Sequence, residues 1–195
     1  MKRVLGSLRA KTGWVLLATL ACSPTATVTD QADGPVPAKV TLELAPAANS
    51  FVVGTSGHVT ARALDRANRE MVWRAPRRIE SSDTSVLQVN PDGSVLARRV
   101  GFSRLRLTWA GNVYVQDSVL VAVGFRGVGT VRFVPVEGGC WVIRTELLAG
   151  LEAPLLPNAF KTDGLRVRIA ARPAQFGSFC MVGTLVELDS IRVEP

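Results

Sequence analysis

The chain has 195 residues, of which 47% are hydrophobic, 20% charged and 6% aromatic, with a formal net charge of +7. This balance is typical of a globular protein and excludes disorder over the whole length. Because no run of 18 apolar residues occurs, a multi-span membrane protein is also excluded. One histidine and three cysteines are poor material for a metal centre, so we expect no metal and no cofactor.

The first 21 residues have the composition of an export signal. Four basic residues lie within positions 2–11, an apolar stretch follows at 14–21, and loop-forming residues begin directly after Cys22. The apolar stretch is too short to span a bilayer, and basic charge before it is typical of a signal peptide. We predict a cleaved signal over residues 1–21. The alternative is a core helix at the start of a cytosolic domain.

The segment Thr19-Leu20-Ala21-Cys22 resembles the lipobox of bacterial lipoproteins. The resemblance implies cleavage before Cys22 and diacylation of its thiol, and two acyl chains are enough for stable membrane anchoring. Ser23 after the cysteine implies sorting to the outer membrane in a cell with two membranes. Thr19 departs from the Leu that the family prefers, so cleavage nearby by ordinary signal peptidase is the alternative. Residues 22–37 then form a flexible tether.

Removal of the signal peptide lowers the net charge of the chain. The signal contributes four of the 23 basic residues and none of the 16 acidic ones, so the mature chain keeps a net charge of +3. A nucleic-acid-binding protein is therefore not supported by composition.

The two remaining cysteines, Cys140 and Cys180, form an even pair in an exported chain. Neither lies in a Cys-x-x-Cys motif or near the single histidine, which disfavours a role in metal binding or redox chemistry. We predict a disulfide bond between them, because exported proteins fold in oxidising compartments.

Hydrophobic residues alternate with polar ones through residues 38–123. The alternation is clearest at 59–63 and 104–109, and turn-forming residues separate these segments from their neighbours. About seven short strands in this length predict a β-sandwich. The other expected strands lie at 40–44, 86–89, 94–97 and 113–123.

The stretch from Ser81-Ser82-Asp83 through Asn90-Pro91-Asp92-Gly93 to Val95 resembles the central signature of bacterial Ig-like domains of group 2. The resemblance covers residues 38–123 and implies an Ig-like β-sandwich that serves as a surface spacer or adhesion module without catalysis. The chain departs from the family at Ile79, where the family usually has Trp, and in the Arg-rich insert 74–78.

Residues 124–195 show a second set of alternating segments, at 131–133, 140–143, 165–169 and 181–193. They predict a small OB-like β-barrel with a short helical turn within 147–160. The alternation changes phase near Asp189, which predicts a β-bulge there. Gly127 and Gly129 are interpreted as a hinge between the two domains. The segments 139–141 and 180–183 resemble a pattern in small secreted bacterial proteins of unassigned function, and that resemblance implies no functional residue.

Side chains of the second domain suggest both ligand binding and simple packing. Trp141, Phe176 and Phe179 could form a carbohydrate-stacking patch, or could pack in the core and against the disulfide bond. Phe133 points inward by phase. We also expect cross-strand ion pairs, with Arg166 and Arg168 opposite Glu187 and Asp189.

Arginines of the first domain form the other candidate site. Arg98, Arg104 and Arg106 could share a face that binds anionic envelope polymer or lipid headgroups, since Arg binds phosphate and carboxylate bidentately. The alternative is an ordinary solvated surface, because the chain uses Arg far more than Lys throughout. His58 lies out of phase with its buried neighbours and faces solvent, and no Gly-x-Ser-x-Gly elbow is present.

The sequence thus predicts an all-β, non-enzymatic lipoprotein of the bacterial cell envelope. An Ig-like spacer presents a small barrel, which binds a protein or glycan partner, and the only membrane contact is the lipid anchor. The alternatives are a structural accessory subunit of an envelope assembly and a secreted enzyme inhibitor.

Overall fold

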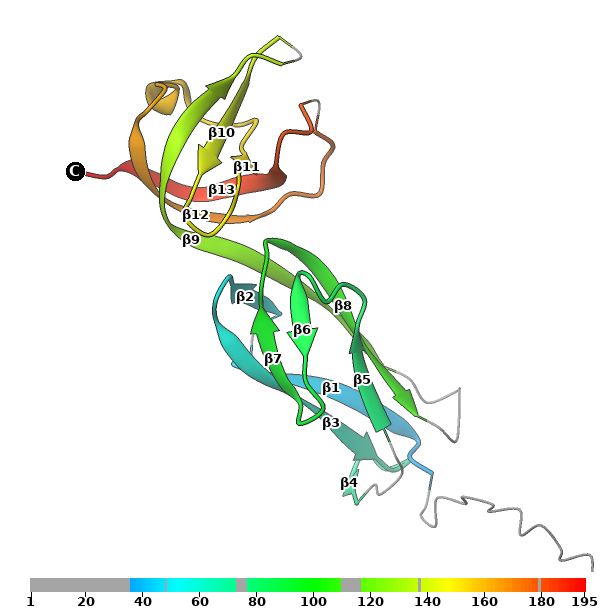
Figure 1. Cartoon of the computed structure of the whole chain (residues 1–195). Helices are drawn as coiled ribbons and strands as arrows, with labels where there is room; N and C mark the ends of the chain where they lie inside the picture. Colours follow the sequence, from blue (N-terminus) through cyan, green and yellow to red (C-terminus); the bar gives the residue numbers. More distant parts are fainter. Residues whose placement is uncertain (1–35, 48, 73–76, 110–116, 137, 179) are drawn as a thin grey trace, which may run out of the picture. The chain divides into compact units, whose positions relative to one another are not determined.

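The computed structural model describes residues 36–195 apart from positions 48, 73–76, 110–116, 137 and 179 (Figure 1). Every regular element in these residues is a β-strand except one 3-10 turn, so the predicted all-β class is confirmed. In chain order the elements are β1 (Lys39–Ala45), β2 (Ser50–Val52), β3 (Ser56–Leu64), β4 (Glu70–Met71), β5 (Arg77–Ser81), β6 (Leu87–Val89), β7 (Ser94–Ala97), β8 (Gly101–Trp109), β9 (Ser118–Val134), β10 (Cys140–Arg144), β11 (Leu151–Glu152), η1 (Asn158–Phe160), β12 (Arg166–Pro173) and β13 (Thr184–Val193).

One sheet of the first half is antiparallel, with the strand order β1-β3-β7-β6 and β4 paired to β3. The alternation predicted for β3 is present, because Val59 and Ala63 are buried whereas His58, Thr60 and Arg62 are exposed. Alternate side chains of a strand point to opposite faces, so one face of this sheet packs inward and the other meets solvent.

The facing layer contains β5, β8 and the first part of β9, with β2 added parallel to β9. Leu105 and Leu107 of β8 are fully buried, while Arg104 and Arg106 between and beside them are exposed. Leu105 shares one apolar cluster with residues of both sheets, including Val59. Two sheets that bury a common face make the predicted β-sandwich.

The turn before β6 is held by the residues that carry the Ig-like resemblance. The Asp83 carboxylate accepts hydrogen bonds from the hydroxyl and the N–H of Ser85 and from the N–H of Val86. These hydrogen bonds lower the pKa of Asp83, the Ser85 hydroxyl having the largest effect. Ser81 and Ser103 share a hydrogen bond of 2.7 Å between their hydroxyls beneath the turn. Ile79 packs half-buried against the sandwich core.

The second half is a closed five-stranded barrel in which β9, β10, β11, β13 and β12 pair in that order and β12 returns to β9. Only β11 and β13 are parallel. The turn η1 lies between β11 and β12, within the segment predicted to hold a helical turn. A five-stranded mixed barrel of this kind is the predicted OB-like arrangement.

The ladder between β12 and β13 contains the predicted bulge but not the predicted ion pairs. Ala170 pairs with Ser190 and Ala171 pairs with Leu188, so Asp189 is the extra residue. The expected pairing of Arg166 and Arg168 with Glu187 and Asp189 is wrong. Those two carboxylates instead pair with Arg172.

Arg168 forms a bidentate ion pair with Glu194, with nitrogen-to-oxygen distances of 2.8 and 2.6 Å. The register explains the difference, because Arg172 lies opposite Glu187 whereas Arg168 lies opposite Arg192. The same ion pair lowers the pKa of Glu194 and raises that of Arg168.

β9 is a single strand of 17 residues that belongs to both the sandwich and the barrel (Figure 1). The expected domain division at 123/124 therefore falls inside a strand. The hinge expected at Gly127 and Gly129 is wrong, since both continue β9. Their lack of a side chain has a packing reason: a Cβ on Gly127 would lie 2.8 Å from the Phe125 ring, and one on Gly129 would lie 2.5 Å from Cγ2 of Ile143.

We expect Gly129→Ala to lower the free energy of unfolding by about 1–3 kcal/mol, because the added methyl overpacks the barrel interior. The new Cβ would also lie 2.8 Å from the carbonyl oxygen of Arg144, which cannot rotate away. Gly177→Ala is the matched control, since a Cβ there meets nothing within 4 Å. Urea denaturation measures both variants, and equal stabilities for the two would contradict this account of β9.

Candidate functional site: a hairpin and a loop joined by a disulfide bond

The predicted disulfide bond between Cys140 and Cys180 is present. Cys140 is the first residue of β10, and Cys180 lies in the connection 174–183 between β12 and β13. Their Cα atoms are 6.3 Å apart, within the usual range for disulfides. The bond therefore fastens the long β12–β13 loop to the turn end of the β9–β10 hairpin, where Cys140 pairs with Val134.

A buried carboxylate holds the same loop at a second point. Glu152 of β11 is only 2% exposed, and its carboxylate accepts hydrogen bonds from the Ser178 hydroxyl and from the N–H of Val182, the latter at 3.4 Å. The Ser178 oxygen in turn accepts from the N–H groups of Cys180 and Met181, at 3.1 and 2.9 Å. A buried carboxylate is costly to leave without donors, so this network restrains the loop.

The sequence signal for this network was a lone Glu within an apolar segment. Glu152 pairs with Val142 of β10 and with Leu185 of β13. Alternation alone gives no sign of which loop supplies the hydrogen-bond donors, because Ser178 is 26 residues further along the chain.

The hairpin carries an aromatic pair at the rim of the barrel. Phe133 of β9 and Trp141 of β10 are directly opposite in register, with ring centroids 5.1 Å apart and a tilted geometry. Phe133 has the inward phase of Val131, but it lies beyond the closed part of the barrel and is 46% exposed. Trp141 is half-buried and packs against the barrel core. The inward position predicted for Phe133 from its phase is therefore wrong in its consequence, because the side chain lies where the barrel no longer encloses it and stays 46% exposed.

The disulfide-linked loop also exposes apolar side chains. Phe176 is 40% exposed and Met181 is 85% exposed. Met181 has φ of 51°, in the left-handed region that residues other than glycine rarely adopt. Such a conformation costs about 1–3 kcal/mol and is concentrated at functional sites. Phe179, the third residue of the predicted stacking patch, lies outside the described residues.

The three candidate arginines of the first half are not brought together on one element. Arg104 and Arg106 lie on the exposed side of β8. Arg98 follows β7 and donates to the side chain of Gln88 on β6, in the other sheet, at 3.1 Å. The geometry therefore offers no preformed three-arginine cluster among these residues.

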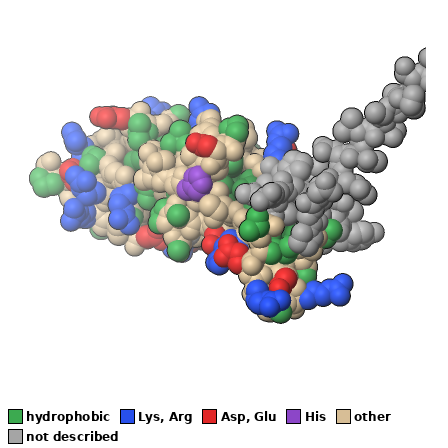
Figure 2. Space-filling view, turned by 90° about the horizontal axis from the view of Figure 1, so that it is seen from below, with side chains coloured by type: hydrophobic (Ala, Val, Ile, Leu, Met, Phe, Trp, Pro, Cys, Tyr) green, Lys and Arg blue, Asp and Glu red, His purple; other side chains and the backbone are tan. Residues whose placement is uncertain are grey.

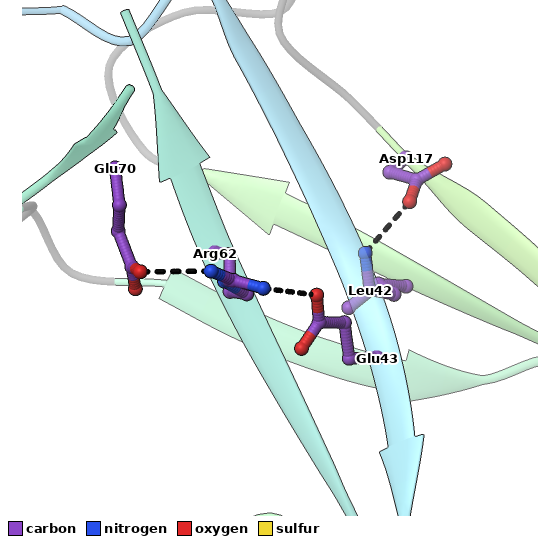
Figure 3. Close-up of polar contacts among 5 residues, drawn as sticks. All are labelled: Leu42, Glu43, Arg62, Glu70 and Asp117. Atoms are coloured by element: carbon purple, nitrogen blue, oxygen red, sulfur yellow. Dashed lines mark hydrogen bonds and ion pairs between the residues drawn. The ribbon is translucent and has the colours of Figure 1, made fainter. Parts of the chain in front are cut away.

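A polar groove on the sandwich is lined by His58, Arg62, Glu70, Glu80 and Asp92 among other residues. Its charged groups already engage neighbours. Arg62 bridges Glu43 of β1 and Glu70 of β4 at 2.8 Å each, and these hydrogen bonds raise its pKa (Figure 3).

Elsewhere in this groove, Asp92 accepts hydrogen bonds from the hydroxyl and the N–H of Ser94. These hydrogen bonds lower the pKa of Asp92, the hydroxyl having the larger effect, and the nearby His58 lowers it further. His58 is exposed as predicted, and the only histidine side chain of the chain is visible on the face in Figure 2. The groove thus has the character of a solvated surface with internal ion pairs.

Two structural features bear on metal and membrane binding. Within the described residues, no group of three or more His, Cys, Asp or Glu side chains is arranged to bind a metal ion. No helix in that part of the chain is both long and apolar enough to cross a membrane.

Comparison with known protein families finds no match. Comparison with curated proteins finds none either. Among solved structures, the crystal structure of domains 4 and 5 of the S-layer protein SbsC is similar to this chain at a TM-score of 0.39 and 12% sequence identity, over 77% of this chain and 98% of that one.

Replacement of both linked cysteines, Cys140→Ser with Cys180→Ser, is expected to reduce the free energy of unfolding by about 2–4 kcal/mol. The bond spans 40 residues of sequence, and its loss enlarges the unfolded ensemble. Thermal denaturation with and without reductant measures the effect. Reductant should destabilise the wild-type protein and leave the double variant unchanged; a double variant as stable as the oxidised protein would show that the bond is dispensable.

Proposed function

We propose that this chain is a non-enzymatic, lipid-anchored protein of the bacterial cell envelope whose barrel binds a protein or glycan partner. The β-sandwich acts as a spacer between the membrane and the barrel. The binding surface consists of Phe133 and Trp141 on the β9–β10 hairpin and Phe176 and Met181 on the β12–β13 loop. The observation that carries the proposal is the disulfide bond that links these two exposed apolar segments.

The exposed side chains support binding because their exposure has a free-energy cost. Burial of one large apolar side chain is worth about 1.5–3 kcal/mol, yet Phe133, Phe176 and Met181 remain substantially in solvent. Aromatic residues and methionine are enriched at interfaces. Aromatic rings also stack on sugar rings, which keeps a glycan partner within the proposal.

The restraint of the loop supports binding for a second reason. The disulfide bond and the Glu152–Ser178 hydrogen bond hold the loop at two points, so less conformational entropy is lost when a partner binds. The left-handed backbone at Met181 keeps its side chain outward at a cost in stability. A function at this position accounts for that cost.

The envelope location rests on chemistry at two places in the chain. A disulfide bond persists in oxidising compartments, which are outside the cytosol. The basic and apolar composition before Cys22 is that of an export signal, and the Leu20-Ala21-Cys22 segment resembles the lipobox of bacterial lipoproteins, which implies lipid modification of Cys22.

We expect Phe133→Ala and Met181→Gly each to weaken partner binding at least about tenfold, the effect of a contact worth 1.4 kcal/mol. Met181→Gly should leave the fold as stable as the wild-type or slightly more stable, because glycine adopts positive φ without strain. The measurement is photo-cross-linking in native envelopes, with the cross-linker placed at position 176. A glycan partner is detected as recovery of the protein on isolated cell-wall glycan. A protein partner is detected as a cross-linked adduct by mass spectrometry.

Leu96→Ala and Leu120→Ala are the matched controls, because these sandwich residues are 38% and 42% exposed. They should leave binding unchanged. The proposal is wrong if the controls weaken recovery as much as the barrel variants do, or if position 176 yields neither a glycan complex nor a protein adduct.

The lipid anchor has its own test. The intact mass of the protein extracted from its native membrane should correspond to a chain that starts at Cys22 and carries diacylglycerol. Cys22→Ser should abolish the lipid and release the protein from the membrane. A mature wild-type chain that starts elsewhere and has no lipid would refute the anchor and favour a freely secreted binding protein or inhibitor.

A further inference from the structure

The backbone of β9 offers hydrogen-bonding groups along two edges, because successive residues of a strand turn their N–H and C=O groups to opposite sides. The carbonyl of Gly124 accepts from the N–H of Val53, directly after β2, at 2.9 Å. The N–H of Val131 donates to the carbonyl of Leu165, directly before β12, at 2.9 Å. Even-numbered residues of β9 therefore face the edge shared by β2 and β10, and odd-numbered residues face β8 and β12.

Part of the β2 and β10 edge lacks a partner strand among the described residues. The pairing of β2 ends at Gly124, and that of β10 reaches only to Thr130. Between these points Arg126 and Val128 turn their N–H and C=O groups to the unpaired edge, while β12 pairs with the opposite edge without a register shift. The five residues from 125 to 129 span about 16 Å, which is enough for a short added strand.

A groove lies along this edge. β9 residues from Phe125 to Thr130 line it, together with Arg144 at the end of β10 and residues 145–147 that follow it. Leu147 is 69% exposed and provides an apolar contact. The groove therefore combines unused backbone hydrogen-bonding groups with side-chain contacts.

The side chains around the groove are predominantly basic. Arg126, Arg132, Arg144 and Arg166 line it, against one lining carboxylate, that of Glu146. Arg144 of β10 and Arg166 of β12 are the neighbours of Thr130 on its two sides.

Acidic groups near the groove offset only part of this charge. Asp163 pairs with Arg132 at 3.4 Å, and Glu194, which lies near Arg166, is already bound bidentately by Arg168. An excess of positive charge therefore faces the groove, and the matching ligand is anionic.

We infer that this edge binds an extended acidic segment of a partner protein, which adds to β9 as a short strand. Backbone pairing with Arg126 and Val128 provides affinity, and side chains that alternate along the added strand provide specificity. Because alternate residues share a face, the segment has acidic residues at every second position, next to Arg126 and Arg144. This site is independent of the aromatic surface proposed above, since it uses a different stretch of β9 and a different ligand chemistry.

The test uses the mature chain with Cys22→Ser and a fluorescent seven-residue peptide of alternating Glu and Val. Fluorescence anisotropy should detect saturable binding that weakens with salt. A second peptide, N-methylated at every other amide on the pairing side, keeps all charges but cannot donate those backbone hydrogen bonds. We expect it to bind at least about tenfold more weakly, because it loses the hydrogen bonds that its amides donate to the edge of β9.

Variants of the chain separate this site from other basic surfaces. Arg126→Ala and Arg144→Ala should each weaken binding severalfold, and Val128→Pro should weaken it further by removing an edge N–H group. Arg104→Ala on β8 and Phe133→Ala on the hairpin should have no effect. Equal binding of the methylated peptide, competition by inorganic polyphosphate as strong as by the parent peptide, or absence of binding would each overturn the inference.

Discussion

The hydrogen-bonding capacity of β9 is the constraint on which the rest of the structure depends. A strand of 17 residues is about three times the usual length, and its two edges are shared among four other strands, β2, β8, β10 and β12. Its first part places Val121 and Val123 in the sandwich core, and its second part places Phe125 and Val131 in the barrel core. The two halves are thus joined by one continuous strand rather than by a linker. Among the described residues, one stretch of this edge has no partner strand, because the pairing of β2 ends at Gly124 and that of β10 reaches only to Thr130.

The candidate surfaces differ in the physics that makes them suitable for binding. The hairpin and loop present apolar side chains whose burial by a partner is favourable, and the Cys140–Cys180 bond together with Glu152 limits the motion of the loop. The edge of β9 instead offers the backbone groups of Arg126 and Val128, which no strand in the described part of the chain pairs with, and arginine charge. The polar groove near His58 differs from both, because ion pairs such as Arg62 with Glu43 and Glu70 already use its charges.

Local patterns predicted the structure well wherever the cause was local. Alternation located the strands around Val59 and Leu105, and its change of phase located the bulge at Asp189. It did not predict the ion-pair partners of Arg168, because partners depend on the register of two strands. The two glycines suggested a hinge at Gly127 and Gly129, but at Gly129 the absence of a side chain serves close packing against Ile143.

The sequence by itself determined the all-β class, the sandwich followed by a small barrel, and the cysteine pair, because alternation and residue chemistry are properties of neighbouring positions. Only the tertiary structure decided the continuity of β9, the burial of Glu152 against Ser178, the exposure of Phe133 at the barrel rim and the open edge at Arg126 and Val128. These features arise where segments far apart in the sequence end or meet. All segments compete for the same backbone hydrogen-bonding groups, and this competition sets where strands end and which strands pair. Its outcome cannot be deduced from the sequence of any single segment.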